Sequence, residues 1–298
     1  LKLDEDGNIE WQKTYGGSFR DGTNSIQQTK DGGYIVGGFT GSIDGDVDSL
    51  IGEVDCWVIK LDSEGNIEWE DTYGGGSREW IYSIKQTDDS GYIFAGGTES
   101  WTEDVTENKG KEDCWIVKLN RNGKLQWQNS IGGSVYDQAN SVQQTSDGGY
   151  IVCGNVHTDS TNILGKGEQD YLVVKFDENG IIEWQKYYGG SLEDHGSSIQ
   201  QTFDGGYIVA GRTNSTDGDV IRKAEDESFN AWVLKINNEG QIEWQKILDP
   251  GALYHSKSIK QTSDGGFIIS GLGGGLTDDG KGNKGGMYYG LVKLKGDR

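Results

Sequence analysis

The chain has 298 residues, among them 49 Gly, one Pro and 10% aromatic residues, and its formal net charge at pH 7 is −21. A phosphate backbone or an anionic membrane surface requires a basic footprint, so this charge argues against nucleic acids and lipid headgroups as partners. Three Cys are too few for a disulfide framework, and no apolar run reaches about 18 residues, which argues against membrane insertion.

The first predicted elements are short strands joined by tight turns. Residues 8–15 contain an IEW stretch that alternates apolar and polar side chains, as a half-buried strand does. SIQQT at 25–29 predicts a second strand, and an Asp-Gly turn leads into the almost unbroken apolar run at 33–38. Such a run is typical of a strand buried on both faces. DCWVIKLD at 55–62 predicts the next strand, and a Gly-bearing turn returns the chain to another IEW stretch.

This order of elements recurs through the whole chain. The Thr of the QQT-type stretch stands at Thr29, Thr87, Thr145, Thr202 and Thr262, so the repeats are 58, 58, 57 and 60 residues apart. Four antiparallel strands at a fixed period are typical of a β-propeller blade. An open β-solenoid is the alternative fold, but its coils are usually shorter and need capping ends.

We therefore predict one all-β domain over residues 1–298, a five-bladed β-propeller with four-stranded antiparallel blades. The last repeat ends in a third strand, YYGLVKLK, so we expect the N-terminal strand to join that blade and close the ring. The predicted blades are approximately 16–73, 74–131, 132–188, 189–248, and 249–298 together with 1–15.

Differences among the repeats collect in two connections, from the second strand to the third and from the fourth strand to the next blade. Loops on a rigid scaffold commonly carry binding residues. In four repeats an acid stands four residues before the Ser that opens the first strand, and the residue after the acid varies. An alternative role for the acids is to cap backbone N–H groups where the strand begins. The candidate ligand-binding residues are Trp80, Trp101, Tyr136, His195, Tyr254 and His255, with the acids Asp21, Glu79, Asp137 and Asp194.

The long connection of the first repeat carries alternating carboxylates, and the fourth repeat carries a shorter version. Oxygen ligands in alternate positions resemble the opening of a calcium loop, so calcium is the candidate cofactor. A closing bidentate Glu is missing, and Asp-Gly-Asp is also a good turn sequence in its own right. The candidate metal ligands are Asp44, Asp46, Asp48, Asp217 and Asp219.

Catalysis needs an asymmetric set of reacting groups, and the sequence offers no such set. His157, His195 and His255 stand at no metal-binding spacing, and neither a P-loop nor a G-x-S-x-G motif is present. The sequence therefore predicts a protein that is not an enzyme. The alternative is a glycosidase like the five-bladed arabinanases, which would use carboxylates at the channel mouth.

The phrases DGGYIVAG, DxWVIKLDxxGNIEWQK, YGGSxxD and SxDGDV resemble the repeats of secreted or surface-anchored propeller proteins of bacteria and archaea. The resemblance covers essentially the whole chain and implies an extracellular or cell-surface module, sometimes beside adhesive or carbohydrate-binding domains. By architecture alone, the chain is also similar to five-bladed lectins of the tachylectin kind.

Together these observations predict a non-enzymatic binding module that recognises a glycan or surface polymer on the face with the long loops. The alternatives are the glycosidase-like enzyme and a protein-interaction or spacer scaffold. The chain opens in mid-pattern at Leu1, so we expect a monomeric module of a longer protein.

Overall fold

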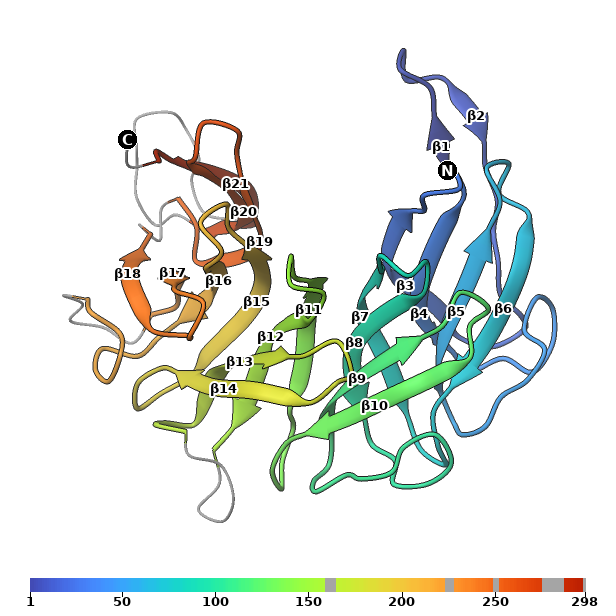
Figure 1. Ribbon diagram of the computed structural model, residues 1–298, viewed down its shortest axis with the longest axis horizontal. Helices are drawn as coiled ribbons and strands as arrows, with labels where there is room; N and C mark the ends of the chain where they lie inside the picture. The colour runs from blue at the N-terminus through green and yellow to red at the C-terminus, as the bar shows by residue number, and fades with distance from the viewer. Residues whose placement is uncertain (159–164, 223–227, 249–251, 275–286, 297–298) are drawn as a thin grey trace. The chain divides into compact units, whose positions relative to one another are not determined.

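The computed structural model describes residues 1–158, 165–222, 228–248, 252–274 and 287–296. Every regular element in these ranges is a β-strand (Figure 1). A helix long and apolar enough to cross a membrane is therefore absent from the described ranges. The chain divides into two compact units, Leu1–Gly132 and Gly133–Arg298.

The first unit holds two four-stranded antiparallel sheets whose strands follow chain order. The strands of the first sheet are β3 (Asp21–Gln28), β4 (Tyr34–Thr40), β5 (Asp55–Leu61) and β6 (Ile67–Tyr73). Those of the second are β7 (Glu79–Gln86), β8 (Tyr92–Thr98), β9 (Asp113–Leu119) and β10 (Leu125–Ile131). The sheets stack, since β7 packs against β3, β4 and β5.

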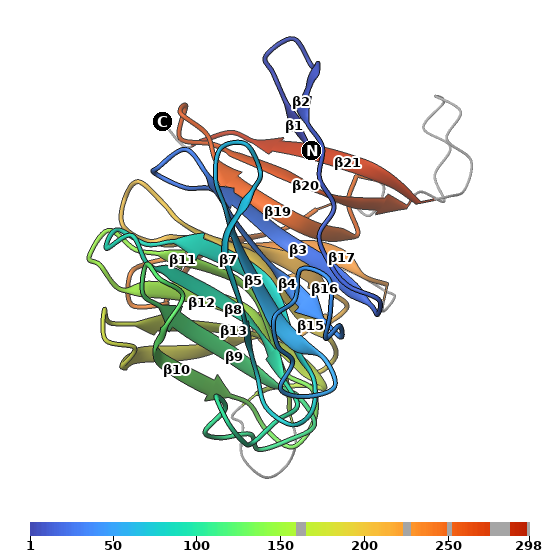
Figure 2. The same cartoon turned by 90° about the vertical axis from the view of Figure 1, so that its right-hand side faces the viewer.

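The second unit continues the pattern with two four-stranded sheets and one sheet of three described strands. The four-stranded sheets are β11 (Gln138–Gln144), β12 (Tyr150–His157), β13 (Gln169–Phe176) and β14 (Ile182–Tyr188), then β15 (Asp194–Gln201), β16 (Tyr207–Thr213), β17 (Asn230–Ile236) and β18 (Ile242–Ile247). The last sheet is β19 (His255–Gln261), β20 (Phe267–Gly274) and β21 (Met287–Leu294), whose strands run side by side in Figure 2. The predicted all-β fold of four-stranded antiparallel sheets is confirmed.

The turn between the first and second strands is set by one Asp and one Gly. Thr29 Oγ1 donates a 2.5 Å hydrogen bond to Asp31 Oδ1, and the same oxygen accepts a 3.0 Å bond from Gly33 N. Gly32 between them has φ +89°, a conformation that a side chain disfavours. The same bonds recur at Thr87, Thr145, Thr202 and Thr262.

The core lies between neighbouring sheets, where close packing leaves room only for a small residue at one position in the second strand of each sheet. A Cβ on Gly37 of β4 would stand 3.0 Å from Ile81 and Ile84 of β7. The equivalent positions hold Ala95, Cys153, Ala210 and Ser270. Aromatic rings fill the wider space further out, where Phe94 and Trp115 pack edge to face with centroids 5.5 Å apart.

The outer strands β6 and β14 also hold the next sheet through a Trp and a Tyr. Tyr73 donates a 2.5 Å hydrogen bond to Gly123 O, and Tyr188 donates one of 2.6 Å to Gly240 O. Trp184 Nε1 donates a 3.0 Å bond to Asn238 O in the same turn as Gly240. We call this contact of a Trp and Tyr with the following turn the clasp.

The N-terminus differs from the prediction that the chain opens with a fourth strand. Two short strands, β1 (Lys2–Leu3) and β2 (Ile9–Trp11), form a hairpin in which Lys2 pairs with Trp11. Lys60 and Trp69 pair in the same way between β5 and β6. The chain therefore opens with the end of a third strand, and two residues were too short a segment to signal it.

Candidate functional site

The four predicted acids are bound by the protein's own backbone and hydroxyl groups. Glu79 accepts hydrogen bonds of 2.9 Å from Gly75 N and Thr98 Oγ1. Asp194 accepts 2.8 Å bonds from Gly190 N and Ser215 Oγ, and burial raises its pKa to about 6. Asp21 and Asp137 accept equivalent bonds from Gly17 N and Gly133 N. Glu79, Asp137 and Asp194 are fully buried, so these carboxylates hold the link between blades.

The carboxylates proposed for calcium are used in a similar way. Asp44 Oδ1 accepts a 2.7 Å bond from Ser18 N, and Asp46 Oδ2 accepts one of 3.0 Å from Gly16 N. Asp217 and Asp219 accept from Ser191 N and Gly189 N, at 2.7 and 3.3 Å, whereas Asp48 donates its backbone N–H to Glu70. Within the described ranges no group of three His, Cys, Asp or Glu could hold a metal ion. Calcium binding stays a prediction, which thermal unfolding with calcium and with chelator tests.

The aromatic candidates divide between the two units. Trp80 lies half-buried on β7 opposite Gly97, while Trp101 follows β8 with 68% of its surface exposed. Tyr136 lies in the second unit, exposed, just before β11, and Tyr254 is half-buried just before β19.

Two of the predicted residues, His195 and His255, lie in one polar cluster of the second unit. His195 on β15 pairs with Arg212 on β16, and Arg212 Nη2 donates a 3.2 Å hydrogen bond to His195 Nε2. The guanidinium carbon of Arg212 also lies 4.3 Å from the ring centre of Phe229, a cation–π contact. Glu193 places Oε2 3.3 Å from His195 Nε2.

The other part of the cluster joins two neighbouring sheets. Ser197 Oγ on β15 lies 3.1 Å from Nε2 of His255 on β19. Ser197 is half-buried, and His255 is 9% exposed. A hydroxyl within hydrogen-bond reach of an imidazole is the arrangement of an activated nucleophile and its base.

The surroundings keep both imidazoles neutral. Burial lowers the pKa of His255 to about 3, and the positive charges of Lys257 and Arg212 act in the same direction. Burial and the Arg212 charge lower the pKa of His195 to about 4, against the opposing effect of Glu193. A neutral His255 has a ring-nitrogen lone pair at pH 7, so Nε2 can accept the hydrogen bond of the Ser197 hydroxyl.

The cluster stands where the repeats differ most clearly in chemistry. At the position of Ser197, two other repeats have Asn24 and Asn140, whose side-chain amides donate 2.8 Å bonds to backbone carbonyls of the next blade. The fourth repeat instead presents a hydroxyl to an imidazole. Sequence reasoning missed Ser197, Arg212 and Glu193, although comparing the repeats position by position along the first two strands could have found them.

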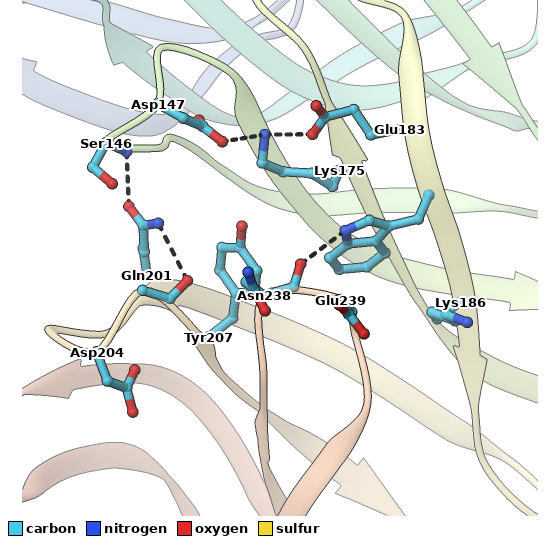
Figure 3. A pocket seen from close by; sticks show the side chains of 12 residues that line it. Ser146, Asp147, Lys175, Glu183, Lys186, Gln201, Asp204, Tyr207, Asn238 and Glu239 are labelled. Atoms are coloured by element: carbon cyan, nitrogen blue, oxygen red, sulfur yellow. Dashed lines mark hydrogen bonds and ion pairs between the residues drawn. The ribbon is translucent and has the colours of Figure 1, made fainter.

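A separate groove of ≈ 630 Å³ lies among the short turns of the second unit (Figure 3). Lys175 on its wall bridges Asp147 and Glu183, at 3.0 and 2.8 Å. Lys60 and Lys235 bridge equivalent acids, and Lys118 pairs with Asp89. Because this network recurs from repeat to repeat, the groove belongs to the framework of the fold.

No protein-family model and no curated protein matches the sequence. Solved β-propeller structures do match the fold. The NanB sialidase of Streptococcus pneumoniae is 14% identical with a TM-score of 0.46, over 81% of this chain and 36% of that chain. A gluconolactonase of Xanthomonas campestris is 9% identical with a TM-score of 0.43, over 80% and 68%. A thermostable family-43 glycoside hydrolase is 10% identical with a TM-score of 0.38, over 95% and 94%.

These neighbours correct the prediction of a non-enzymatic binding module, because they are sialidase, glycosidase and gluconolactonase enzymes. The structure also brings Ser197 Oγ within 3.1 Å of His255 Nε2, a pairing that the sequence analysis did not anticipate. Sequence spacing could not show it, because the two residues come from different repeats. Identities this low show the fold alone, so the chemistry must come from this chain's own residues.

Proposed function

We propose that the chain is a carbohydrate-active hydrolase that cleaves an ester or lactone bond of a sugar. The observation that carries this proposal is the 3.1 Å contact between Ser197 Oγ and His255 Nε2, with the imidazole held neutral by burial. In this pair a half-buried serine hydroxyl, which a substrate can reach in part, lies next to an imidazole base.

The reaction follows from the roles of these groups. His255 Nε2 takes the proton of Ser197 as Oγ attacks the carbonyl carbon, and the Lys257 ammonium stabilises the developing oxyanion. The intermediate collapses, the C–O bond to the alcohol breaks, and His255 returns the proton to the leaving oxygen. Water, deprotonated by His255, then attacks the acyl carbon. The bond from that carbon to Ser197 Oγ breaks, and His255 returns the proton to Oγ, which releases the acid and restores the serine.

A glycosidase reaction is the second candidate, because a sialidase and a family-43 glycoside hydrolase are among the solved structures that match the fold. The two reactions give different products. Ester or lactone cleavage releases one carboxylic acid per turnover, whereas glycoside cleavage creates a new reducing end.

The test compares Ser197→Ala with Asp194→Asn on acetylated, lactone and glycosidic sugar substrates. We expect acid release by the native protein to fall by at least ~100-fold in Ser197→Ala, and reducing ends to remain undetected. Ser146→Ala is the matched control, because Ser146 is exposed outside the cluster. Full activity in Ser197→Ala at an unchanged melting temperature would overturn the ester proposal. Reducing ends that the native protein releases, and that are lost in Asp194→Asn at an unchanged melting temperature, would establish the glycosidase.

We also propose that the five repeats close into a five-bladed ring, with the N-terminal strand as the outer strand of the last blade. Trp11 and Tyr15 form the same clasp on residues 63–65 as other outer strands form on the following sheet, with bonds of 3.0 and 2.6 Å. Outer-strand residues therefore precede β3 as they precede β7 and β15. In the structure Trp11 pairs with Lys2 of β1. In the proposed register it pairs with Lys293 of β21 instead, so β21 takes the position that β1 occupies.

Apolar side chains at both ends of the series support closure. Ile26 of the first repeat is 61% exposed, whereas its equivalents Ile84 and Ile259 are fully buried. Leu291 of the last repeat is 74% exposed, whereas the equivalent Val58 is fully buried. Each end therefore leaves uncovered the apolar surface that neighbouring blades cover.

An extracellular or cell-surface location for this module also remains a proposal, supported by the resemblance of its repeats. Fractionating cells of the source organism with an antibody to the module tests it, and recovery from the cytosol would contradict it.

A further inference from the structure

The polar cluster combines two permanent cations within a strongly acidic chain. Arg212 contacts His195 in this cluster, and Lys257 lies two residues beyond His255 on the same strand, β19. The whole chain carries a formal charge of −21. A local concentration of positive charge in such a chain has to be explained by the residues around it or by a ligand.

The surrounding protein does not use all the donors of Arg212. One Nη2–H goes to His195, and the guanidinium plane packs on Phe229. Nε–H is buried and has no hydrogen-bond acceptor among the described residues. A guanidinium offers five N–H donors in a rigid fork, so Arg212 is oriented by its neighbours and retains donor capacity.

Acidic groups of the described residues do not neutralise the cluster. Glu193, with 42% of its side chain exposed, lies at the edge beside His195. Asp194 is turned away to Gly190 and Ser215. Among the described residues, Glu193 is thus the one exposed carboxylate beside a cluster that carries the charges of Arg212 and Lys257, and the balance favours an incoming anion.

We propose that the sugar substrate is acidic and that Arg212 binds its carboxylate or sulfate group while Ser197 faces the bond to be cleaved. The placement of the bond to be cleaved at Ser197 rests on the proposed hydrolase function, whereas the binding of an anion by Arg212 does not. Arg212 is then a specificity-determining residue, and His195 and Phe229 are positioning residues that fix its guanidinium. Lys257 remains free to act on the oxyanion.

The test uses the Ser197→Ala variant, which binds without turnover, and calorimetric titration with three probes. These are a trigalacturonate, its fully methyl-esterified form, and a sulfated oligosaccharide of similar length. We expect an acidic probe to bind at least ~10-fold more tightly than the neutral one, and this difference to shrink at high salt. The carboxylated and sulfated probes show which anion the site prefers.

Adding Arg212→Gln should remove the preference, and Arg212→Lys should restore part of it, because charge without the fork binds less specifically. Arg78→Gln is the matched control, since Arg78 is an exposed arginine of the first unit. Equal affinity for acidic and neutral probes, or a preference unchanged in Arg212→Gln, would overturn the inference.

The two proposals fail separately. Serine-dependent hydrolysis of neutral esters without an acidic preference would keep the hydrolase and reject the anion site. Arg212-dependent binding of acidic sugars, with no ester cleavage by the native protein, would keep the anion site and reject the hydrolase.

Discussion

Two imidazoles of the second unit are held in their neutral form by burial and nearby positive charge. Folded His255 and His195 have pKa values of about 3 and about 4, whereas an unfolded His titrates near 6.5. Below that pH the unfolded chain binds protons that the folded protein does not, so both residues reduce stability as the pH falls. Asp194 increases stability as the pH falls from ~6 to ~4, because its pKa in the folded protein is raised to about 6 and the folded protein takes up the proton first.

The His255→Gln variant isolates the histidine contribution. We expect its free energy of unfolding to fall less than that of the native protein between pH 7 and pH 5, because one neutral imidazole has been removed. Urea unfolding at both pH values measures this. An identical pH dependence in the two proteins would show that His255 is not held neutral.

The buried acids should matter for stability more than for activity. Asp194→Ala leaves Gly190 N and Ser215 Oγ without their acceptor, so we expect a loss of ~1–3 kcal/mol in the free energy of unfolding. Asp88→Ala, a change at a surface carboxylate, is the control and should change little. Equal stability of the two variants would contradict the capping role.

The sequence predicted the two histidines of the polar cluster but not Ser197 or Arg212, because contacts between distant residues place those two there. His195 and His255 attracted notice because the residue after each capping position varies from repeat to repeat. Ser197 is 58 positions from its partner His255 and looks like an ordinary strand residue. Arg212 meets His195 across a hairpin, and strand register, rather than local sequence, places it there.

At the scale of the element, the clasp explains why Gly follows the third strand at Gly123 and at Gly240. Gly240 has φ +74°, and a Cβ there would stand 3.1 Å from the Trp184 ring. Gly205 has φ +86°, but a Cβ there would meet nothing within 4 Å. Both positions carry the cost of a left-handed backbone, and only the first of the two also carries a packing cost.

Gly240→Ala should therefore destabilise the protein more than Gly205→Ala. We expect ~1–2 kcal/mol for the backbone at each site and a further ~1–3 kcal/mol at Gly240 from displaced Trp184. Chemical unfolding of both variants measures the difference. Equal losses would mean that Trp184 does not pack against this turn.

The strands themselves could be predicted because local chemistry specifies them. Asp-Gly turns, the unbroken apolar run of the second strand and the regular period all act within a few residues. The hairpin of β1 and β2 was not predicted, because a strand of two residues is too short to show alternation of apolar and polar side chains. The one sequence signal for it was the match of Lys2-Leu3 to Lys60-Leu61 at the end of β5. The capping role of Asp44 and Asp46 was not predicted, because the backbone N–H groups that they accept from belong to residues 16 and 18, more than 20 positions earlier in the chain.

For the whole molecule, the proposed ring makes a geometric prediction. The register of β5 with β6 pairs Ile59 with Glu70, and Val292 and Gln12 are the equivalent positions of the last third strand and the first fourth strand. In a closed ring, Gln12→Cys with Val292→Cys should form a disulfide on mild oxidation. Gel mobility and mass measure it, with each single variant as control. A double variant that stays fully reduced or links only between molecules would contradict closure.

The central claim is that Ser197 is a nucleophile activated by His255. A fluorophosphonate probe tests it without knowledge of the substrate, because an activated serine displaces fluoride and keeps the phosphonate on Oγ. After labelling of the folded chain and peptide mapping by mass spectrometry, we predict an adduct on Ser197 that is lost in His255→Ala and in heat-denatured protein. An unlabelled Ser197, or equal labelling with and without His255, would contradict the account.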